Sequence, residues 1–169
     1  MIPVDFDKNS LILTFIFTSL LFSGIITSLY IYYKISNSFY KYLTLAGSIP
    51  MVAVLLLGYL LSPQKIVFEN DKLKIDRIIS DVYIDYSEIK EINIVNSQEV
   101  FLNAKRISAS GGFWGYYGKF KSEKLGVYYL YARRDKGDYV IIKTNEKIYI
   151  LAPSNIDAFV KKLKEKCKL

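Results

Sequence analysis

Few residues in this chain of 169 could do chemistry. There is no histidine and a single cysteine, Cys167, so the usual imidazole base, an internal disulfide and a thiolate metal cluster are excluded. The sequence has no G-x-S-x-G, phosphate-binding loop, G-x-G-x-x-G or EF-hand pattern. Asp81, Asp85 and Glu88 could supply paired carboxylates, but carboxylates scattered along strand edges are typically solvated. We therefore predict no catalytic residue, no metal site and no cofactor.

Residues 111–120, GGFWGYYGKF, form a glycine–aromatic segment with cations close by. Aromatic rings beside cations suit a membrane interface, a peptide groove or stacking on a flat ligand. In the competing interpretation the rings turn inward, the glycines permit tight packing and the lysines are merely solvated. The candidate binding surface comprises Phe113, Trp114, Tyr116, Tyr117, Lys119, Lys121 and Lys124.

Two long apolar runs precede this segment, at residues 11–33 and 42–61, and neither contains a charge. A helix rises about 1.5 Å per residue, so roughly 20 apolar residues cross a hydrocarbon core about 30 Å thick. Core helices of a small soluble domain would need a polar face, and neither run has one. The sequence predicts an N-terminal tail at 1–10, transmembrane helices at 11–33 and 42–61, and a connecting loop at 34–41.

The two spans are more typical of an anchor than of a pore or transporter, because neither has an ionisable residue at mid-membrane depth. The tail before the first span has two aspartates and one lysine instead of a basic region, and no A-x-A site follows, so we expect no cleavage. Ser19, Ser23, Gly24 and Ser28 place small residues at four-residue spacing. That spacing permits packing of the hairpin or homo-oligomerisation through the helices, although small residues also occur there by chance.

The basic residues near the span ends predict the orientation of the hairpin. Five lie on the side of the termini, namely Lys8, Lys65, Lys72, Lys74 and Arg77, and two, Lys34 and Lys41, lie in the connection. The positive-inside rule then places both termini and everything after Ser62 in the cytoplasm. The expected location is the cell membrane, with the lipid bilayer as one partner.

The remaining residues, 64–169, have the size of one domain and read mainly as β-strands. Alternating patterns predict strands at 66–69, 72–76, 81–86, 89–95, 127–132, 139–143 and 147–151, with a further strand around 119–121. Residues 104–117 are rich in Gly and Ser and are predicted to be irregular. After Pro153, a helix is predicted at 154–166, capped by Ser154, with Phe159 on its apolar face.

This order of short strands closed by one amphipathic helix resembles the pleckstrin-homology-like (PH-like) fold. Residues 112–120, 131–132 and 149–154 are similar to the bacterial and archaeal PH-domain family, and Arg133-Arg134 departs from it, since that family more often has Thr there. The motif residues that carry the resemblance are Gly112, Gly115, Gly118, Gly126, Pro153 and Phe159. The expected fold class is α+β: a transmembrane hairpin, then a mainly β sandwich or open barrel capped by the C-terminal helix.

The resemblance implies a non-catalytic binding or scaffolding module at the membrane surface, with an unknown protein partner or ligand. The long basic loop of lipid-binding eukaryotic PH domains has no counterpart here, because Asn70-Asp71 is short and acidic. The alternatives are a basic–aromatic surface for anionic lipid or nucleic acid, and an accessory subunit of a membrane transport or enzyme complex. Nucleic acid is disfavoured despite a pI near 9.3, because the positive charge is spread over the domain.

Overall fold

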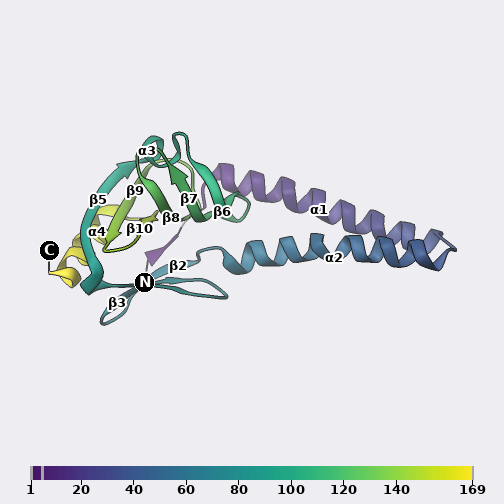
Figure 1. The fold of residues 1–169 in the computed structure, drawn as a ribbon, viewed down its shortest axis with the longest axis horizontal. Coiled ribbons are helices and arrows are strands. Elements are labelled where there is room, and N and C mark those ends of the chain that lie inside the picture. The colour runs from purple at the N-terminus through teal and green to yellow at the C-terminus, as the bar shows by residue number, and fades with distance from the viewer. Residues whose placement is uncertain (1, 5, 169) are drawn as a thin grey trace.

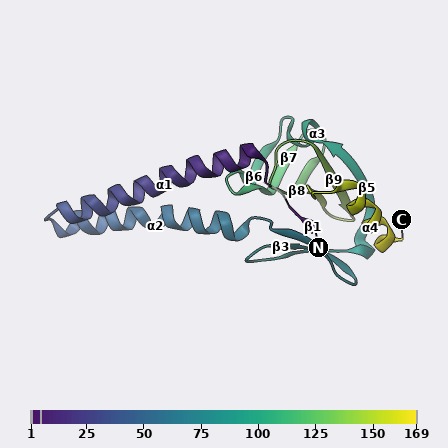
Figure 2. The same cartoon turned by 180° about the vertical axis from the view of Figure 1, so that it is seen from behind.

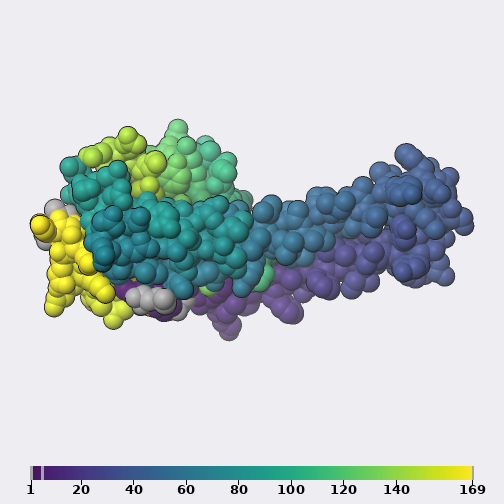
Figure 3. Space-filling model, turned by 90° about the horizontal axis from the view of Figure 1, so that it is seen from below, coloured from purple at the N-terminus to yellow at the C-terminus, as the bar shows by residue number. Residues whose placement is uncertain are grey.

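The computed structural model describes residues 2–4 and 6–168, and it consists of a helical hairpin attached to a β-domain (Figures 1 and 2). The hairpin is formed by α1 (Lys8–Lys34) and α2 (Ser38–Leu61), and the Ser28 hydroxyl donates to the carbonyl of Thr44, 2.6 Å away, across the pair. On the face that Figure 3 shows, both helices project from the domain, and no other segment covers their projecting part. The apolar runs found in the sequence are therefore helices that lie outside the folded β-core.

The β-domain contains two sheets, as the alternating sequence patterns predict. The first sheet has the order β1-β2-β3-β4. Its strands are β1 (Ile2–Pro3), β2 (Lys65–Phe68), β3 (Lys72–Asp76) and β4 (Val82–Asp85). The second has the order β5-β9-β10-β8-β7-β6, and β10 lies between β9 and β8, antiparallel to the former and parallel to the latter. Its strands are β5 (Ile89–Asn96), β6 (Lys105–Gly112), β7 (Gly115–Ser122), β8 (Gly126–Ala132), β9 (Asp138–Thr144) and β10 (Ile148–Leu151).

Three helical elements complete the domain: a short 3-10 helix η1 (Tyr86–Glu88), α3 (Ser97–Phe101) and α4 (Ile156–Cys167). The amphipathic helix α4 closes the core between the sheets. Phe159 and Leu163 are completely buried there, and the Phe159 ring lies 5.3 Å from that of Phe68. A second apolar cluster, built around Tyr128, Leu130 and Ile150, covers the other face of the six-stranded sheet. The α+β fold class, with a β-sandwich capped by a C-terminal helix, is confirmed.

The irregular structure expected at residues 104–117 is wrong, because β6 runs through most of that segment and pairs with β7. This stretch has few β-branched residues, so its strand depends on pairing and not on local preference. Gly118 permits the close pairing: its φ is +111°, and an added Cβ would lie 2.4 Å from the carbonyl oxygen of Ser108. Here the glycine is needed for two backbones to approach each other.

Three smaller expectations also differ from the structure. The cap of α4 is Asn155, whose side chain accepts from the Ala158 N–H at 3.0 Å, and not Ser154. The N-terminal tail contributes to the domain, because Ile2 pairs with Ile66 and Val4 is buried in the core. Helix α3 was not foreseen, since a single turn of five residues is too short to show periodicity.

Candidate functional site

The middle of the glycine–aromatic segment forms the tight turn between β6 and β7, with Gly112 paired to Gly115 and Phe113 and Trp114 at the tip. Trp114 has a φ of +57°, which is uncommon for a bulky residue. Gly115 is needed beside it, because an added Cβ would lie 2.7 Å from the carbonyl oxygen of Ala132. The turn therefore presents two large aromatic side chains, Phe113 and Trp114, at the end of the sheet nearest α1 and α2.

Both aromatic side chains of the turn pack on the two helices of the hairpin. The ring centroid of Phe113 lies 6.0 Å from that of Phe17 in α1, and that of Trp114 lies 4.9 Å from Tyr59 in α2. Phe113 and Trp114 are half-buried, so neither is an exposed anchor, and Trp114 also packs against the edge of the core between the sheets. The turn contacts both helices and links the domain to the hairpin.

Hydrogen bonds fix this turn to the helices as well. The buried Thr14 hydroxyl in α1 accepts from the Trp114 N–H at 3.0 Å and donates to the Gly112 carbonyl at 3.4 Å. The Ser62 hydroxyl, just after α2, donates to the Trp114 carbonyl at 2.7 Å. We call this set of contacts, made by Thr14, Ser62, Phe113, Trp114 and Tyr117, the helix–sheet joint.

The domain also satisfies the last carbonyl groups of α2, which have no partner within the helix. The Tyr117 hydroxyl donates to the Gly58 carbonyl at 2.6 Å, and the Ile79 N–H donates to the Leu60 carbonyl at 3.2 Å. Burial raises the pKa of the Tyr117 phenol, so the group keeps the proton that it donates. Side chains and backbone of the β-domain therefore act as the C-terminal cap of α2.

The start of α1 is attached to the domain through Asp7. Its carboxylate accepts from the Ser10 N–H at 2.7 Å, which caps α1, and from the Asp135 N–H at 2.8 Å. Burial works to raise the pKa of Asp7, but hydrogen bonds involving Asp135 and Ser10 outweigh it and lower that pKa. Burial and the adjacent Asp7 raise the pKa of the Asp135 carboxyl. The cap of α1 thus carries the negative charge that its N-terminus favours.

The other predicted surface residues do not gather at the joint. Tyr116 lies on the opposite face of β7 from Tyr117, with its ring 5.2 Å from that of Phe101. Lys119 lies over the ring of Tyr129. Lys121 is exposed, and Lys124 is also exposed and pairs with Glu99. Of the motif residues, Gly126 opens β8 with φ +67°, and Pro153 precedes α4.

Several residues of the joint could not be identified from the sequence. Thr14 and Ser62 are ordinary residues of a membrane helix or a linker, and their partners are about 100 and 50 residues away in the chain. Arg133 marks the same region: it is buried, its Nε donates to the Ser62 hydroxyl at 3.2 Å, and burial lowers its pKa. Among the residues that attach the helices to the domain, Asp7 alone has a recognisable sequence signal, because an Asp directly before an apolar run is a typical helix N-cap.

The described residues contain no cluster of three or more His, Cys, Asp or Glu that could hold a metal. Asp81, one of the carboxylates considered for catalysis, accepts from the Arg77 N–H at 2.9 Å and pairs with Lys74 at 2.9 Å. The Arg77 N–H and then Lys74 lower the pKa of that carboxyl, as expected of a structural carboxylate. The arrangement as a whole is suited to positioning and to binding.

Two sheets closed by a C-terminal helix, behind two long apolar helices, define a PH-like domain with features of membrane anchoring. Residues 64–167 match the bacterial PH domain family, and the chain belongs to that family. No curated protein and no solved structure matches the chain. The family is consistent with a binding or scaffolding module, and it specifies no ligand or partner.

Proposed function

We propose that this protein is an integral membrane scaffold, in which α1 and α2 span the bilayer and the PH-like domain presents a partner-binding surface directly beside it. The domain is expected in the cytoplasm, with non-catalytic binding as its role. The observation that carries the proposal is the helix–sheet joint, since it couples the domain to a hairpin whose apolar surface is largely uncovered in the described part of the chain.

The exposure of the hairpin supports insertion into a bilayer. Only 11% of the apolar stretch of α1 and 6% of that of α2 are buried within the chain, whereas a core helix of a soluble protein is mostly buried. Large apolar side chains such as Phe15 and Phe39 are 74% and 70% exposed. Soluble proteins rarely leave contiguous apolar surfaces of this size in water.

The attachment of α1 supports retention of the N-terminal segment. Val4 is buried in the core between the sheets, and the Asp7 N–H donates to the Arg133 carbonyl at 3.2 Å. Removal of the first helix as a signal sequence would take these contacts away from the domain. The first helix therefore behaves as part of the folded protein.

A surface on β6 and β7 suits an acidic partner. Lys105 and Lys121 lie directly opposite each other in the two strands, and both are exposed. Neither forms a salt bridge in the described part of the chain, although facing like charges are unfavourable. They line a hollow of about 530 Å³. Binding of an acidic segment there would relieve the repulsion between Lys105 and Lys121. Lys119 lies further along β7.

Washing membranes with alkaline carbonate tests the anchoring. The full chain is expected to remain in the membrane pellet, and its release into the supernatant would contradict the proposed hairpin.

Purification of the full chain from its own membranes in mild detergent tests the scaffold role. We expect Lys105→Glu with Lys121→Glu to lose a partner that the unmodified protein retains. Lys161→Glu with Lys164→Glu is a matched control, because it reverses two exposed charges on the outer face of α4. A partner retained equally by both double variants would contradict the β6–β7 surface.

A further inference from the structure

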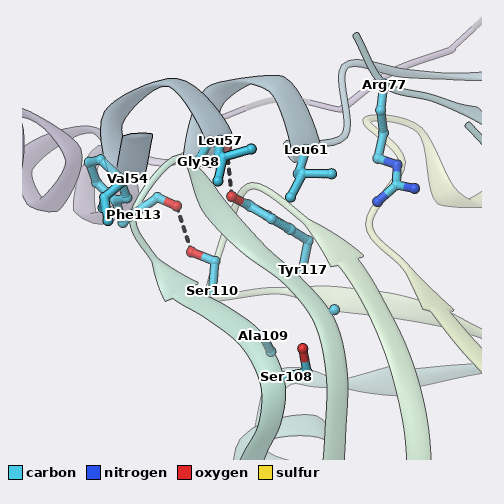
Figure 4. Close-up of a pocket in the computed structure, with 11 residues that line it drawn as sticks. Val54, Leu57, Gly58, Leu61, Arg77, Ser108, Ala109, Ser110, Phe113 and Tyr117 are labelled. Carbon is cyan, nitrogen blue, oxygen red and sulfur yellow. Dashed lines mark hydrogen bonds between the residues drawn. The ribbon is translucent and has the colours of Figure 1, made fainter. Parts of the chain in front are cut away.

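A groove of about 500 Å³ lies between the C-terminal half of α2 and the strands β6 and β7 (Figure 4). Its helix wall is apolar, and Val54, Leu57 and Leu61 follow one another along it. Its sheet wall includes Ser108 and Ser110. Figure 4 shows Arg77 beyond Leu61, with its guanidinium group on the groove side. The groove thus runs from the apolar part of a membrane helix to one cation.

Arg77 has hydrogen-bonding capacity that the chain does not use. Its Nε is buried and has no hydrogen-bond partner, and no salt bridge joins it to a carboxylate in the described part of the chain. Asp81 accepts from the Arg77 backbone but pairs with Lys74 through its other oxygen. The guanidinium lies 5.9 Å from the ring centroid of Tyr131, but that contact leaves the buried Nε without an acceptor. A guanidinium group offers five N–H donors, so an anion is the complement that this arginine lacks.

The position of Arg77 is set by the end of α2. The β3–β4 loop that contains it is fixed there by the bond from the Ile79 N–H to the Leu60 carbonyl. In the same loop, Ile78 and Ile79 are 47% and 39% exposed. If α2 spans the bilayer, this loop lies where hydrocarbon gives way to headgroups, and two isoleucines there would enter the interface.

An apolar groove that leads from membrane depth to a cation at headgroup level matches the chemistry of a phospholipid. An acyl chain would lie along Val54, Leu57 and Leu61, while a phosphate diester would accept two N–H bonds from the planar guanidinium of Arg77. The described residues that line the groove include no carboxylate to attract an ammonium group. A headgroup with net negative charge is therefore favoured over a zwitterionic one.

We propose that this groove binds one anionic phospholipid of the surrounding membrane, with its phosphate on Arg77 and an acyl chain against α2. The proposal rests on the membrane anchoring proposed above and adds a ligand class at the helix–sheet joint. The lipid would fasten the β3–β4 loop and the β6–β7 turn to the same helix, so the domain would be held most firmly in an anionic leaflet.

The test uses the full chain in nanodiscs that contain equal phosphatidylglycerol and phosphatidylcholine with the same acyl chains. Lipids that stay bound are counted by native mass spectrometry. We expect the unmodified protein to retain phosphatidylglycerol selectively and Arg77→Gln to retain about tenfold less. Arg77→Lys, which keeps the charge but loses the planar fork, is expected to be intermediate. Arg106→Gln is the matched control and should behave as the unmodified protein, since Arg106 is exposed and does not line the groove.

Three results would overturn the lipid site: equal retention of the two lipids, retention of phosphatidylglycerol by Arg77→Gln at the unmodified level, or its displacement by inorganic phosphate. Displacement would show a site for a free anion. An unmodified protein that does not enter nanodiscs overturns both the anchoring and the lipid site, whereas entry without lipid selection overturns the lipid site alone. If Arg77→Gln fails to enter nanodiscs, the phosphatidylglycerol retained by Arg77→Lys is compared with that retained by Arg106→Gln. Equal retention by these two variants would overturn the lipid site.

Discussion

At the scale of single residues, the hydroxyl groups of Thr14, Ser62 and Tyr117 connect α1 and α2 with the β6–β7 hairpin. Their partners are the backbone N–H and carbonyl of Trp114, in the turn, and the carbonyl of Gly58, one of the last four of α2. A buried carbonyl or N–H that loses its partner costs more than the net value of an average hydrogen bond. These neutral side chains are therefore more important to the architecture than the charged residues of the surface.

Tyr117→Phe tests this directly. Loss of the hydroxyl leaves the Gly58 carbonyl unpaired, so the free energy of unfolding in detergent micelles should fall by about 1 to 3 kcal/mol. Tyr83→Phe is the matched control, because Tyr83 is 47% exposed, and its effect should stay within about 0.5 kcal/mol. Equal stability of the two variants would show that the Tyr117–Gly58 bond does not hold the joint together.

At the scale of elements, α4 determines whether the space between the sheets is closed. Phe159 and Leu163 fill that space and are fully buried, whereas Lys161 and Lys164 face outward. The helix begins after the Asn155 cap and presents its apolar side at four-residue spacing. The contribution of α4 to the stability of the domain comes from this buried face.

Phe159→Ala should lower the free energy of unfolding by about 3 to 5 kcal/mol, because it leaves a cavity beside Phe68. That is a large share of the roughly 5 to 15 kcal/mol that stabilises a small domain. Chemical unfolding of the full chain measures the change, with Lys161→Ala as a control on the outer face of the same helix. An unchanged midpoint for Phe159→Ala would mean that α4 is not required for the closed core.

The elements with a strong local pattern could be predicted from the sequence. The two apolar helices, the alternating strands from β2 onward and the face of α4 that contains Phe159 all follow from the period of their side chains. The strand β6 could not be predicted, because its Gly and Ser residues become a strand only through pairing with β7. The contacts of Phe113 and Trp114 could not be predicted either, since Phe17 and Tyr59 belong to segments that the sequence alone does not bring to this turn.

At the scale of the whole molecule, the helices and the domain form one connected unit. Both termini of the hairpin are bonded to the β-domain, α1 through Asp7 and α2 through Gly58 and Leu60. A change in the angle between α1 and α2 would therefore move the β6–β7 turn directly. The domain is bonded to both helices of the hairpin and is not a module on a flexible linker.

Sidedness is a prediction at the same scale, because five basic residues on the side of the termini against two in the connection place the domain in the cytoplasm. The natural thiol, Cys167, is a poor probe, since it is half-buried and burial raises its pKa. A Cys167→Ser background with Lys161→Cys should resist an impermeant thiol reagent in intact cells and react after lysis.

The matched control for sidedness is Ser36→Cys in the same background. Ser36 is exposed in the connection between α1 and α2, so this thiol should react in intact cells. The reverse pattern for the two cysteines would place the domain outside the cell.

If the hairpin spans the bilayer as proposed, the turn between β6 and β7 lies between α1 and α2 at the bilayer boundary, and Trp114 reports on this position because it is the only tryptophan. It lines an apolar cavity together with Phe22 and Leu56 of the helices. In vesicles, its emission should be blue-shifted, insensitive to aqueous iodide and quenched by phospholipids brominated near the headgroup end of their chains. Red-shifted emission that iodide quenches and brominated lipids do not would contradict this account.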